Sequence, residues 1–282
     1  MVIAVLTTFH PTQNLLDKIV QLSKQCDYVV IVDDTGPVES SFYSANISFF
    51  SINKNFIYIK NSENMGIAFS LNQGIQRALD LKCDYIVTFD DDTYFCSDYV
   101  SRCLAFISNN VDLSIGAVCM SRGSHFSSGR SEYNEKRSLI TSGFFCRSSI
   151  YQSISFFPDE YFIDLVDFYL SFKIRNKGLK LLELSDIGMI HRVGNMKTIF
   201  FPVKINVFNH SPFRLYYQVR NSIPFFKTFW RTDFVFCAYV LLDVMRIPLK
   251  ALLFEDSKIE RIKYCVKGFV DGVLGRMGRL ND

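Results

Sequence analysis

The chain has 282 residues, of which 49% are hydrophobic and 21% are charged, and its formal net charge is +3 at pH 7. This length suits one large α/β domain with an appendage or two small domains, and the composition argues against disorder over any long stretch. A net charge this small, without a basic run interleaved with aromatic residues, argues against a nucleic-acid-binding protein.

Short apolar runs alternate with helical patterns through the first two-thirds of the chain. The runs predict strands at 2–9, 28–34, 56–60, 85–90 and 115–120, and the segments between them predict helices at 12–25, 66–81 and 97–110. This alternation is typical of a mostly parallel sheet flanked by helices. The opening run MVIAVLTTFHP is interpreted as a buried strand and not as a signal peptide, and the eight cysteines lack CxxC pairs. We therefore expect an α/β protein with reduced core cysteines that stays inside the cell.

The composition changes after about residue 205, where aromatic and aliphatic helical segments carry scattered basic residues. Segment 233–254 has the length of a membrane span, but Asp243, Arg246 and Lys250 interrupt it and Pro248 would kink it. It is therefore predicted to lie in an anionic membrane surface rather than to cross it. Its apolar remainder consists of Val240, Leu241, Met245, Leu249 and Leu252. A core helix or a contact with a second copy of the chain is the alternative interpretation.

Two acidic clusters follow predicted strands. Asp33 and Asp34 end the second strand, and Asp90, Asp91 and Asp92 follow the fourth. Because ligands gather beyond the carboxyl ends of parallel strands, both clusters are expected to face one crevice. Carboxylates two apart on an extended segment point the same way, so Asp90 and Asp92 can bind one hard cation such as Mg²⁺ or Mn²⁺. The alternative is an acidic turn before a helix N-terminus.

Several segments, taken in order, resemble the family 2 glycosyltransferases of the GT-A fold, and within them the bacterial rhamnosyltransferases of surface polysaccharide synthesis. VLTTFHP resembles the opening strand, IVDDT the segment that holds the base, and NSENMGIAFSLNQGI the pattern NxxNxGiaxalNqGi. TFDDDTY is similar to TLDQDS, YFIDLVDFYLSFKIRNKGLKL to FIDYVDVEWCLRLRxxGy, and MIHRVG to MPHRLG. ITSGFFCRSSIYQSI, SPFRLYYQVRN and GFVDGVLGRMGR complete the set. The resemblance covers almost the whole chain.

The resemblance implies a GT-A catalytic domain at 1–205, with a donor half at about 1–120 and an acceptor half at about 121–205, and a helical, membrane-associating region at 206–282. It implies an inverting, metal-dependent enzyme that transfers a sugar, with L-rhamnose from dTDP-rhamnose favoured. The acceptor would be a polyprenyl-diphosphate-linked glycan of O-antigen or capsule type. The protein would be peripheral on the inner face of the cell membrane, with a homo-oligomer left open.

The same resemblance assigns roles to individual residues. Asp90 would contact the donor ribose and the metal, Asp92 and His191 would complete the metal shell, and Asp167 would be the catalytic base. An imidazole ligand favours Mn²⁺ over Mg²⁺. A hydrogen-bonded histidine at a strand end is the alternative for His191. Asp91 stands where the family has Gln or Ser, which leaves its role at the donor site open.

The remaining expected contacts surround these groups. The donor-binding set is completed by Thr7, Thr8, Asp33, Asn64, Gly66, Asp91 and Arg220. In it Asp33 would accept the imide N–H of uracil or thymine, and Arg220 or Arg192 would meet the diphosphate. Asp164 would help at the acceptor site, or cap a helix without taking part in the chemistry. Gly66 as an ordinary helix-start glycine and Arg220 as a solvated surface residue stay open.

Two other functions fit the same sequence. Because Asp33 would accept from uracil and thymine alike, the donor can be a UDP-hexose instead of dTDP-rhamnose. From another class, the chain can be a membrane-bound scaffold that keeps the fold without catalysis.

Overall fold

The computed structural model describes residues 1–36, 41–127, 132–191, 197–201, 203–207, 211–248, 253 and 257–280, with the backbone alone at 41, 191, 197–201 and 203–207. The chain forms two compact units. The first consists of Met1–Asp159 and Asp167–His191, and the second of Glu160–Val166 and Arg192–Asp282. The expected domain boundary after residue 205 therefore falls inside the second unit. Arg192 lies outside the described residues.

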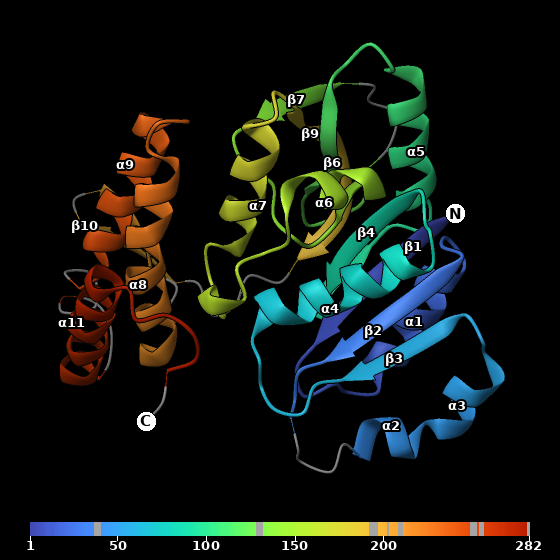
Figure 1. Ribbon diagram of the computed structural model, residues 1–282, viewed down its shortest axis with the longest axis horizontal. Helices are drawn as coiled ribbons and strands as arrows, with labels where there is room; N and C mark the ends of the chain where they lie inside the picture. Colours follow the sequence, from blue (N-terminus) through green and yellow to red (C-terminus); the bar gives the residue numbers. More distant parts are fainter. Residues whose placement is uncertain are drawn as a thin grey trace. The chain divides into compact units, whose positions relative to one another are not determined.

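A nine-stranded sheet, counted over the described residues, forms the centre of the first unit (Figure 1). One side of it has the order β3–β2–β1–β4, and all three of these neighbouring pairs are parallel. The strands are β1 (Val2–Thr8), β2 (Tyr28–Asp33), β3 (Phe56–Lys60) and β4 (Tyr85–Asp90). These bounds agree with the predicted strands to within a residue, and the α/β fold class is confirmed.

The other side of the sheet is mainly antiparallel. Strand β8 (Phe144–Arg147) lies between β4 and β6 (Ile115–Arg122) and is antiparallel to both. Beyond β6 the order continues with β9 and β5, and β7 also pairs with β9. These strands are β5 (Thr93–Phe95), β7 (Tyr133–Lys136) and β9 (Lys180–His191). Only the β6–β9 pair on this side is parallel among the described strands.

Amphipathic helices cover the sheet because each buries one apolar stripe. In α4 (Ile67–Asp80) the buried stripe recurs every three or four residues as Ala68, Leu71, Ile75 and Ala78. Gly74 lets α4 approach β1 closely, since a Cβ there would lie 2.3 Å from Val5 Cγ1. The other helices of this unit are α1 (Asn14–Ser23), α2 (Ser41–Ala45), α3 (Ile47–Ile52), α5 (Tyr99–Asn109), α6 (Ser148–Ile154) and α7 (Val166–Arg175). A 3₁₀ turn at Asp159–Tyr161 precedes α7. All eight cysteines of the chain are buried thiols, as expected.

The second unit is built on helix α8 (Pro212–Phe229), which packs against α9 (Phe234–Met245) and α11 (Lys258–Leu274). A small core of Leu215, Val219, Val244 and Cys265 joins the three helices. Strands β10 (Lys197–Phe201) and β11 (Val203–Val207) form an antiparallel hairpin. Glycines allow α11 to pack tightly, because a Cβ at Gly268 would lie 2.5 Å from the Tyr216 carbonyl oxygen.

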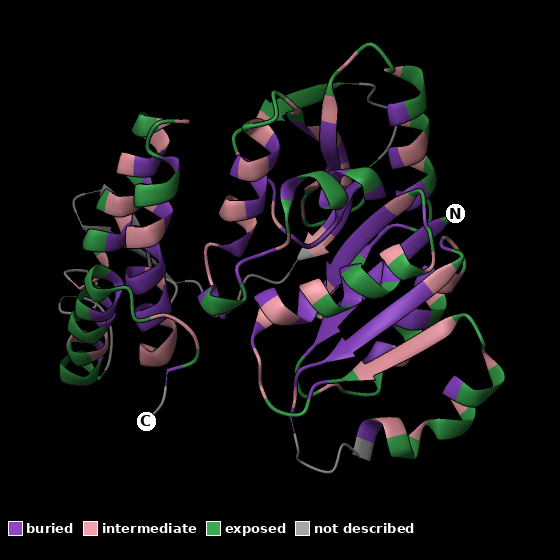
Figure 2. Cartoon of the chain, in the orientation of Figure 1, coloured by how far each residue is buried: buried purple, intermediate pink, exposed green. Residues whose placement is uncertain are grey.

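The predicted surface helix at 233–254 differs from the structure. Helix α9 ends at Met245, and Val240, expected on its apolar outer face, is buried. Leu249, Lys250 and Leu252 lie outside the described residues. Instead, α11 shows an exposed apolar stripe of Ile259, Val266, Val270 and Val273, and parts of α9 and α11 are exposed in Figure 2. In the part of the chain that the structure describes, every helix is too short or too polar to span a bilayer.

Candidate active site

The ends of three parallel strands place several expected site residues at one edge of the sheet. Thr8 lies opposite Asp33 in the β1–β2 pair, and Thr7 lies opposite Asp90 in the β1–β4 pair. This is the carboxyl edge, where open α/β sheets bind their ligands. The structure therefore brings Thr7, Thr8, Asp33 and Asp90 together, as the sequence predicts.

The acidic turn, formed by Asp90, Asp91 and Asp92, is tied to its surroundings by specific hydrogen bonds. The Asp90 N–H donates to Ser142 Oγ at 3.1 Å, and Thr7 Oγ1 donates to Asp90 Oδ1 at 3.4 Å. The Asp91 carboxylate accepts from Thr8 Oγ1 at 2.5 Å and from the Phe9 N–H at 3.3 Å. Asp91 thus points to the end of β1, whereas Asp92 is exposed.

Lys18 of α1 is a buried cation beside this turn, and the sequence reasoning missed it. Its ammonium donates to the Asp91 carbonyl oxygen and lies 4.5 Å from the centroid of the Tyr94 ring. Burial lowers the pKa of Lys18, while the charges of Asp91, Asp92 and Asp90 oppose that shift. Burial likewise raises the pKa of Asp91, against the hydrogen bonds from Thr8 and Phe9. The sequence did carry a signal that Lys18 is buried, because Lys18 lies in the apolar stripe of α1 with Leu15, Ile19 and Leu22.

Asp33 and Asp34, which form the second acidic cluster, make different contacts. Asp33 is fully buried, and its carboxylate accepts from Tyr58 Oη at 2.6 Å and from Thr35 Oγ1 at 2.5 Å. Its geometry suits a residue that orients Tyr58 and Thr35 better than one that contacts a base directly. Asp34 turns instead toward the start of α4, where it contacts the loop that carries the expected donor-site residues Asn64 and Gly66.

Asp34 and Asn64 organise the loop before α4. Asp34 accepts from the N–H groups of Met65 and Gly66, both at 2.8 Å, and from Asn61 Nδ2 at 2.7 Å. Asn64 Oδ1 also accepts from the Gly66 N–H, at 3.2 Å. Gly66 has φ +89° at the N-cap position of α4, a conformation that favours glycine. These contacts fix a short helix-entry loop in which Gly66 has a backbone role.

The backbone of His191, in β9, lies opposite Thr93 of β5, and Thr93 is the residue that follows Asp92 in the chain. The His191 side chain lies outside the described residues. Among the side chains that are described, no three His, Cys, Asp or Glu groups converge on a metal site. Carboxylate oxygens and an imidazole are ligand types that Mg²⁺ or Mn²⁺ accepts, and the β5–β9 pairing sets the backbone of His191 opposite the residue that follows Asp92.

Asp167 occupies the first turn of α7, where its carboxylate accepts from the Phe168 N–H at 2.9 Å. The segment before it is strained: Phe162, Asp164 and Leu165 have φ values of +64°, +65° and +63°. Strain of this kind costs about 1–3 kcal/mol per residue and clusters at functional sites. Helix α7 begins only at Val166, so Asp164 is neither on its face nor its cap.

The side chains of Asp164 and Arg220 both form hydrogen bonds within the second unit. Arg214 donates to the Asp164 carboxylate twice, with Nε at 3.0 Å from Oδ2 and Nη2 at 3.0 Å from Oδ1. Arg220 is fully buried and donates to the carbonyl oxygens of Glu160, Tyr161 and Gly278. A guanidinium held in this way cannot meet a diphosphate without losing these bonds. We therefore leave Arg220 out of the proposed donor site.

Comparisons with known proteins identify the family and the fold of the chain. The family model described as Glycosyl transferase family 2 matches residues 3–166. The dTDP-rhamnosyl transferase RfbF of Shigella flexneri is 24% identical over 294 residues, which cover 98% of this chain and 96% of that protein. S. aureus TarS 1–349 in complex with UDP-GlcNAc has a TM-score of 0.60 at 16% identity, over 96% and 81% of the two chains. A Pyrobaculum calidifontis mannosyltransferase in complex with GDP-Man and Mn²⁺ also reaches 0.60, at 12% identity over 98% and 87%.

Proposed function

Because the chain belongs to glycosyl transferase family 2 and is a glycosyltransferase with a GT-A-like fold, we propose that it transfers L-rhamnose from dTDP-rhamnose with inversion. The donor assignment is supported by the full-length similarity to the rhamnosyl transferase of Shigella flexneri. The single observation that carries the site is the strand register, which sets Thr7, Thr8 and Asp90 at one carboxyl edge. We propose a lipid-linked glycan of O-antigen or capsule type as the acceptor.

The donor site is proposed from the groups that this edge presents. Thr7, Thr8, Asn64, Gly66 and Asp90 would surround the nucleoside diphosphate, with Asp33 behind them orienting Tyr58 and Thr35. Asp90, Asp92 and His191 would hold a divalent cation, and a fold neighbour solved with Mn²⁺ supports that choice. Such a cation, when bound, offsets the negative charge that develops on a departing diphosphate.

Asp167 is the proposed general base. Its place in the first turn of α7 puts a carboxylate where the helix N-terminus favours negative charge. It would take the proton from the acceptor hydroxyl as that oxygen attacks the anomeric carbon, and the nucleoside diphosphate would leave. One displacement of this kind inverts the anomeric centre.

The Asp167→Asn variant tests this assignment. We expect turnover of dTDP-rhamnose to fall by roughly 100-fold to 10,000-fold, the usual contribution of a general base. Binding of dTDP, measured by calorimetry, should stay within about twofold of the wild type, which shows that the variant is folded. Equal turnover in variant and wild type would remove Asp167 from the base role.

Transfer from a UDP-hexose is the second candidate, because a fold neighbour was solved with UDP-GlcNAc. A panel of dTDP- and UDP-sugars, scored by release of the nucleoside diphosphate, separates the two donors. Faster release from a UDP-sugar than from dTDP-rhamnose would replace the first proposal by the second.

We also propose that the second unit binds the anionic inner surface of the cell membrane, where a lipid-linked acceptor would be found. The outer stripe of α11 is apolar, and among the described residues between 211 and 280 Glu260 is the only exposed carboxylate. Apolar area and positive charge together are what bind an amphipathic helix to anionic lipid. The exposed cations of the same region are Lys227, Arg231, Arg246, Lys258, Lys263, Lys267, Arg276 and Arg279.

Co-sedimentation with vesicles tests this surface. Phosphatidylglycerol vesicles should retain the wild type, phosphatidylcholine vesicles should not, and 1 M salt, which screens charge within about 3 Å, should release part of it. The Val266→Ser, Val270→Ser double variant should bind at least about tenfold more weakly. Val111→Ser, a matched change at an exposed valine of the first unit, should bind normally. Unchanged binding of the double variant, or dimerisation in place of vesicle binding, would contradict the proposal.

A further inference from the structure

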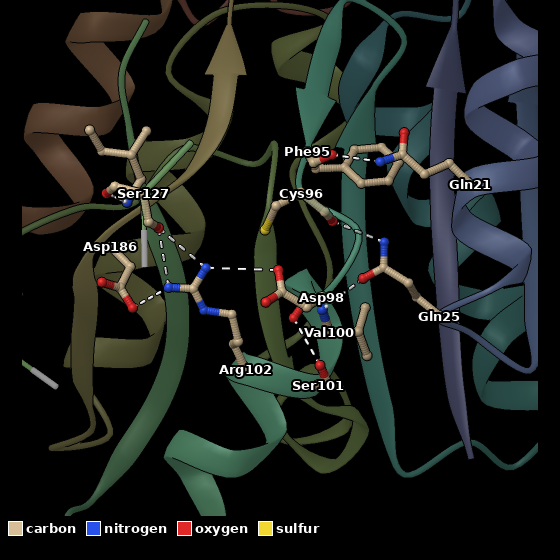
Figure 3. A network of polar contacts seen from close by, with 11 residues as sticks. Gln21, Gln25, Phe95, Cys96, Asp98, Val100, Ser101, Arg102, Ser127 and Asp186 are labelled. Atoms are coloured by element: carbon tan, nitrogen blue, oxygen red, sulfur yellow. Dashed lines mark hydrogen bonds and ion pairs between the residues drawn. The ribbon is translucent and has the colours of Figure 1, made fainter. Parts of the chain in front are cut away.

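Helix α1 and the turn that follows it present a row of three polar side chains to the acidic turn and the strand after it. Lys18 and Gln21, three residues apart, share one face of the helix, and Gln25 lies in the turn just after the helix ends at Ser23. Lys18 donates to the Asp91 carbonyl oxygen, Gln21 Nε2 to that of Phe95 at 2.6 Å, and Gln25 Nε2 to that of Cys96 at 3.1 Å. The two glutamine contacts are drawn in Figure 3.

This row holds the backbone from Asp91 to Cys96 at both ends. At the far end Gln25 also accepts from the Val100 N–H at 3.1 Å, which ties the start of α5 to the turn after α1. At the near end the only charged member of the row, Lys18, meets the only run of three carboxylates in the chain. A neutral donor such as glutamine would satisfy the Asp91 carbonyl oxygen equally well. The charge of Lys18 therefore needs an explanation of its own.

The charges of the acidic turn explain why a charged residue stands at position 18. Three adjacent carboxylates repel one another, and a buried ammonium without anions nearby is strongly disfavoured. All three aspartates act on Lys18 electrostatically. When ionised, the three carboxylates carry a charge of −3 and the ammonium carries +1, which leaves −2 on the four groups.

We propose that Lys18 is a positioning residue, the built-in counter-charge that holds the acidic turn in its binding shape before a divalent cation arrives. Asp91 is its partner in this role: it is anchored to Thr8 and Phe9, and it fixes the turn to β1 and α1 while Asp90 and Asp92 serve the cation. This anchoring role of Asp91 replaces direct donor contact. It rests on the proposed metal-binding function of Asp90 and Asp92.

Hydrogen exchange of the full-length protein in EDTA tests the proposal without metal or turnover. Lys18→Met keeps the alkyl stem and removes the charge, so peptides spanning residues 89–95 should exchange about tenfold faster or more than in the wild type. The Lys18→Met, Asp91→Asn double variant returns the sum to −2, and its carboxamide oxygen still accepts from Thr8. Its exchange should come back to within about threefold of the wild type. Lys24→Met, at an exposed lysine that follows the same helix, is the control and should change nothing.

Two results would overturn the proposal. Wild-type exchange in Lys18→Met would show that the turn does not need the charge, and equally fast exchange in Lys18→Met and the double variant would show that only packing was lost. A second measurement adds Mn²⁺, which should slow exchange of the same peptides more in Lys18→Met than in the wild type. If free Mn²⁺, followed by its electron paramagnetic resonance signal, does not bind the wild type, the proposed metal role fails, and the comparison in EDTA still decides the role of Lys18.

Discussion

Gly143 is the residue of the site region where a single methyl group should do most harm. It has φ +78°, and a Cβ there would lie 2.2 Å from Met189 Sδ and 2.5 Å from Tyr99 Oη. The left-handed conformation costs an alanine roughly 1–2 kcal/mol, and forcing a methyl group into a packed core costs about 1–3 kcal/mol more. We therefore expect Gly143→Ala to lower the free energy of unfolding by about 2–5 kcal/mol.

A matched control separates the two contributions. Gly178 has a similar φ of +75°, but a Cβ there would meet nothing within 4 Å. Gly178→Ala should thus lose only the conformational part, roughly 1–2 kcal/mol. Urea unfolding followed by far-ultraviolet circular dichroism measures both losses. Equal losses in the two variants would refute the steric argument. Because Ser142 beside Gly143 accepts from the Asp90 N–H, Gly143→Ala should also weaken dTDP binding.

Two further predictions concern the cation and the second unit. Excess EDTA should lower turnover by more than about 100-fold and added Mn²⁺ should restore it, since a metal Lewis acid contributes several kcal/mol; full activity in EDTA would exclude this dependence. Burial pushes the pKa of Asp271 up, but hydrogen bonds from Lys267 and Tyr216 outweigh it and the net pKa shift is downward. Asp271 should therefore stabilise the fold above pH 4, with this contribution lost as the pH falls through its lowered pKa. Asp271→Asn should therefore unfold more easily at pH 6, and its stability should fall less steeply as the pH is lowered. The fluorescence of Trp230, the only tryptophan of the chain, follows unfolding. An unchanged dependence of stability on acid pH would count against the pKa shift.

Local patterns in the sequence were enough for the elements that build the parallel half of the sheet. Helix α4 was predicted at 66–81 and runs from Ile67 to Asp80, because its apolar stripe and the glycine before it are both local signals. The strand ends were also placed well enough to bring Thr7 and Asp90 together. Patterns of this kind depend only on neighbours in sequence. They can be recognised because burial of one face places apolar residues at regular spacings.

In the mainly antiparallel half, local patterns predicted β6, at 115–120, but they gave no signal for how its strands pair. Strand β8 pairs Phe144 with Thr88, 56 positions earlier, and nothing local to either residue specifies the other. Ser142 reaches Asp90 by the same long-range pairing. Positive φ at Asp164 and Leu165 could not be predicted from residue type, because leucine rarely adopts it and aspartate adopts it only in a minority of cases. Lys18 could have been found, because a lysine inside an apolar helical stripe needs a buried partner.

The contacts of Arg220 with residues 160–166 determine which fragments of the chain can fold. The carbonyl oxygens that hold the Arg220 guanidinium belong partly to Glu160 and Tyr161, and Asn221 donates to Tyr161, Ile163 and Asp164. A fragment beginning near residue 205 would carry a desolvated cation with half of its acceptors missing, a defect that costs several kcal/mol. A chimaera that exchanges the helical region between relatives must therefore transplant residues 160–166 together with it.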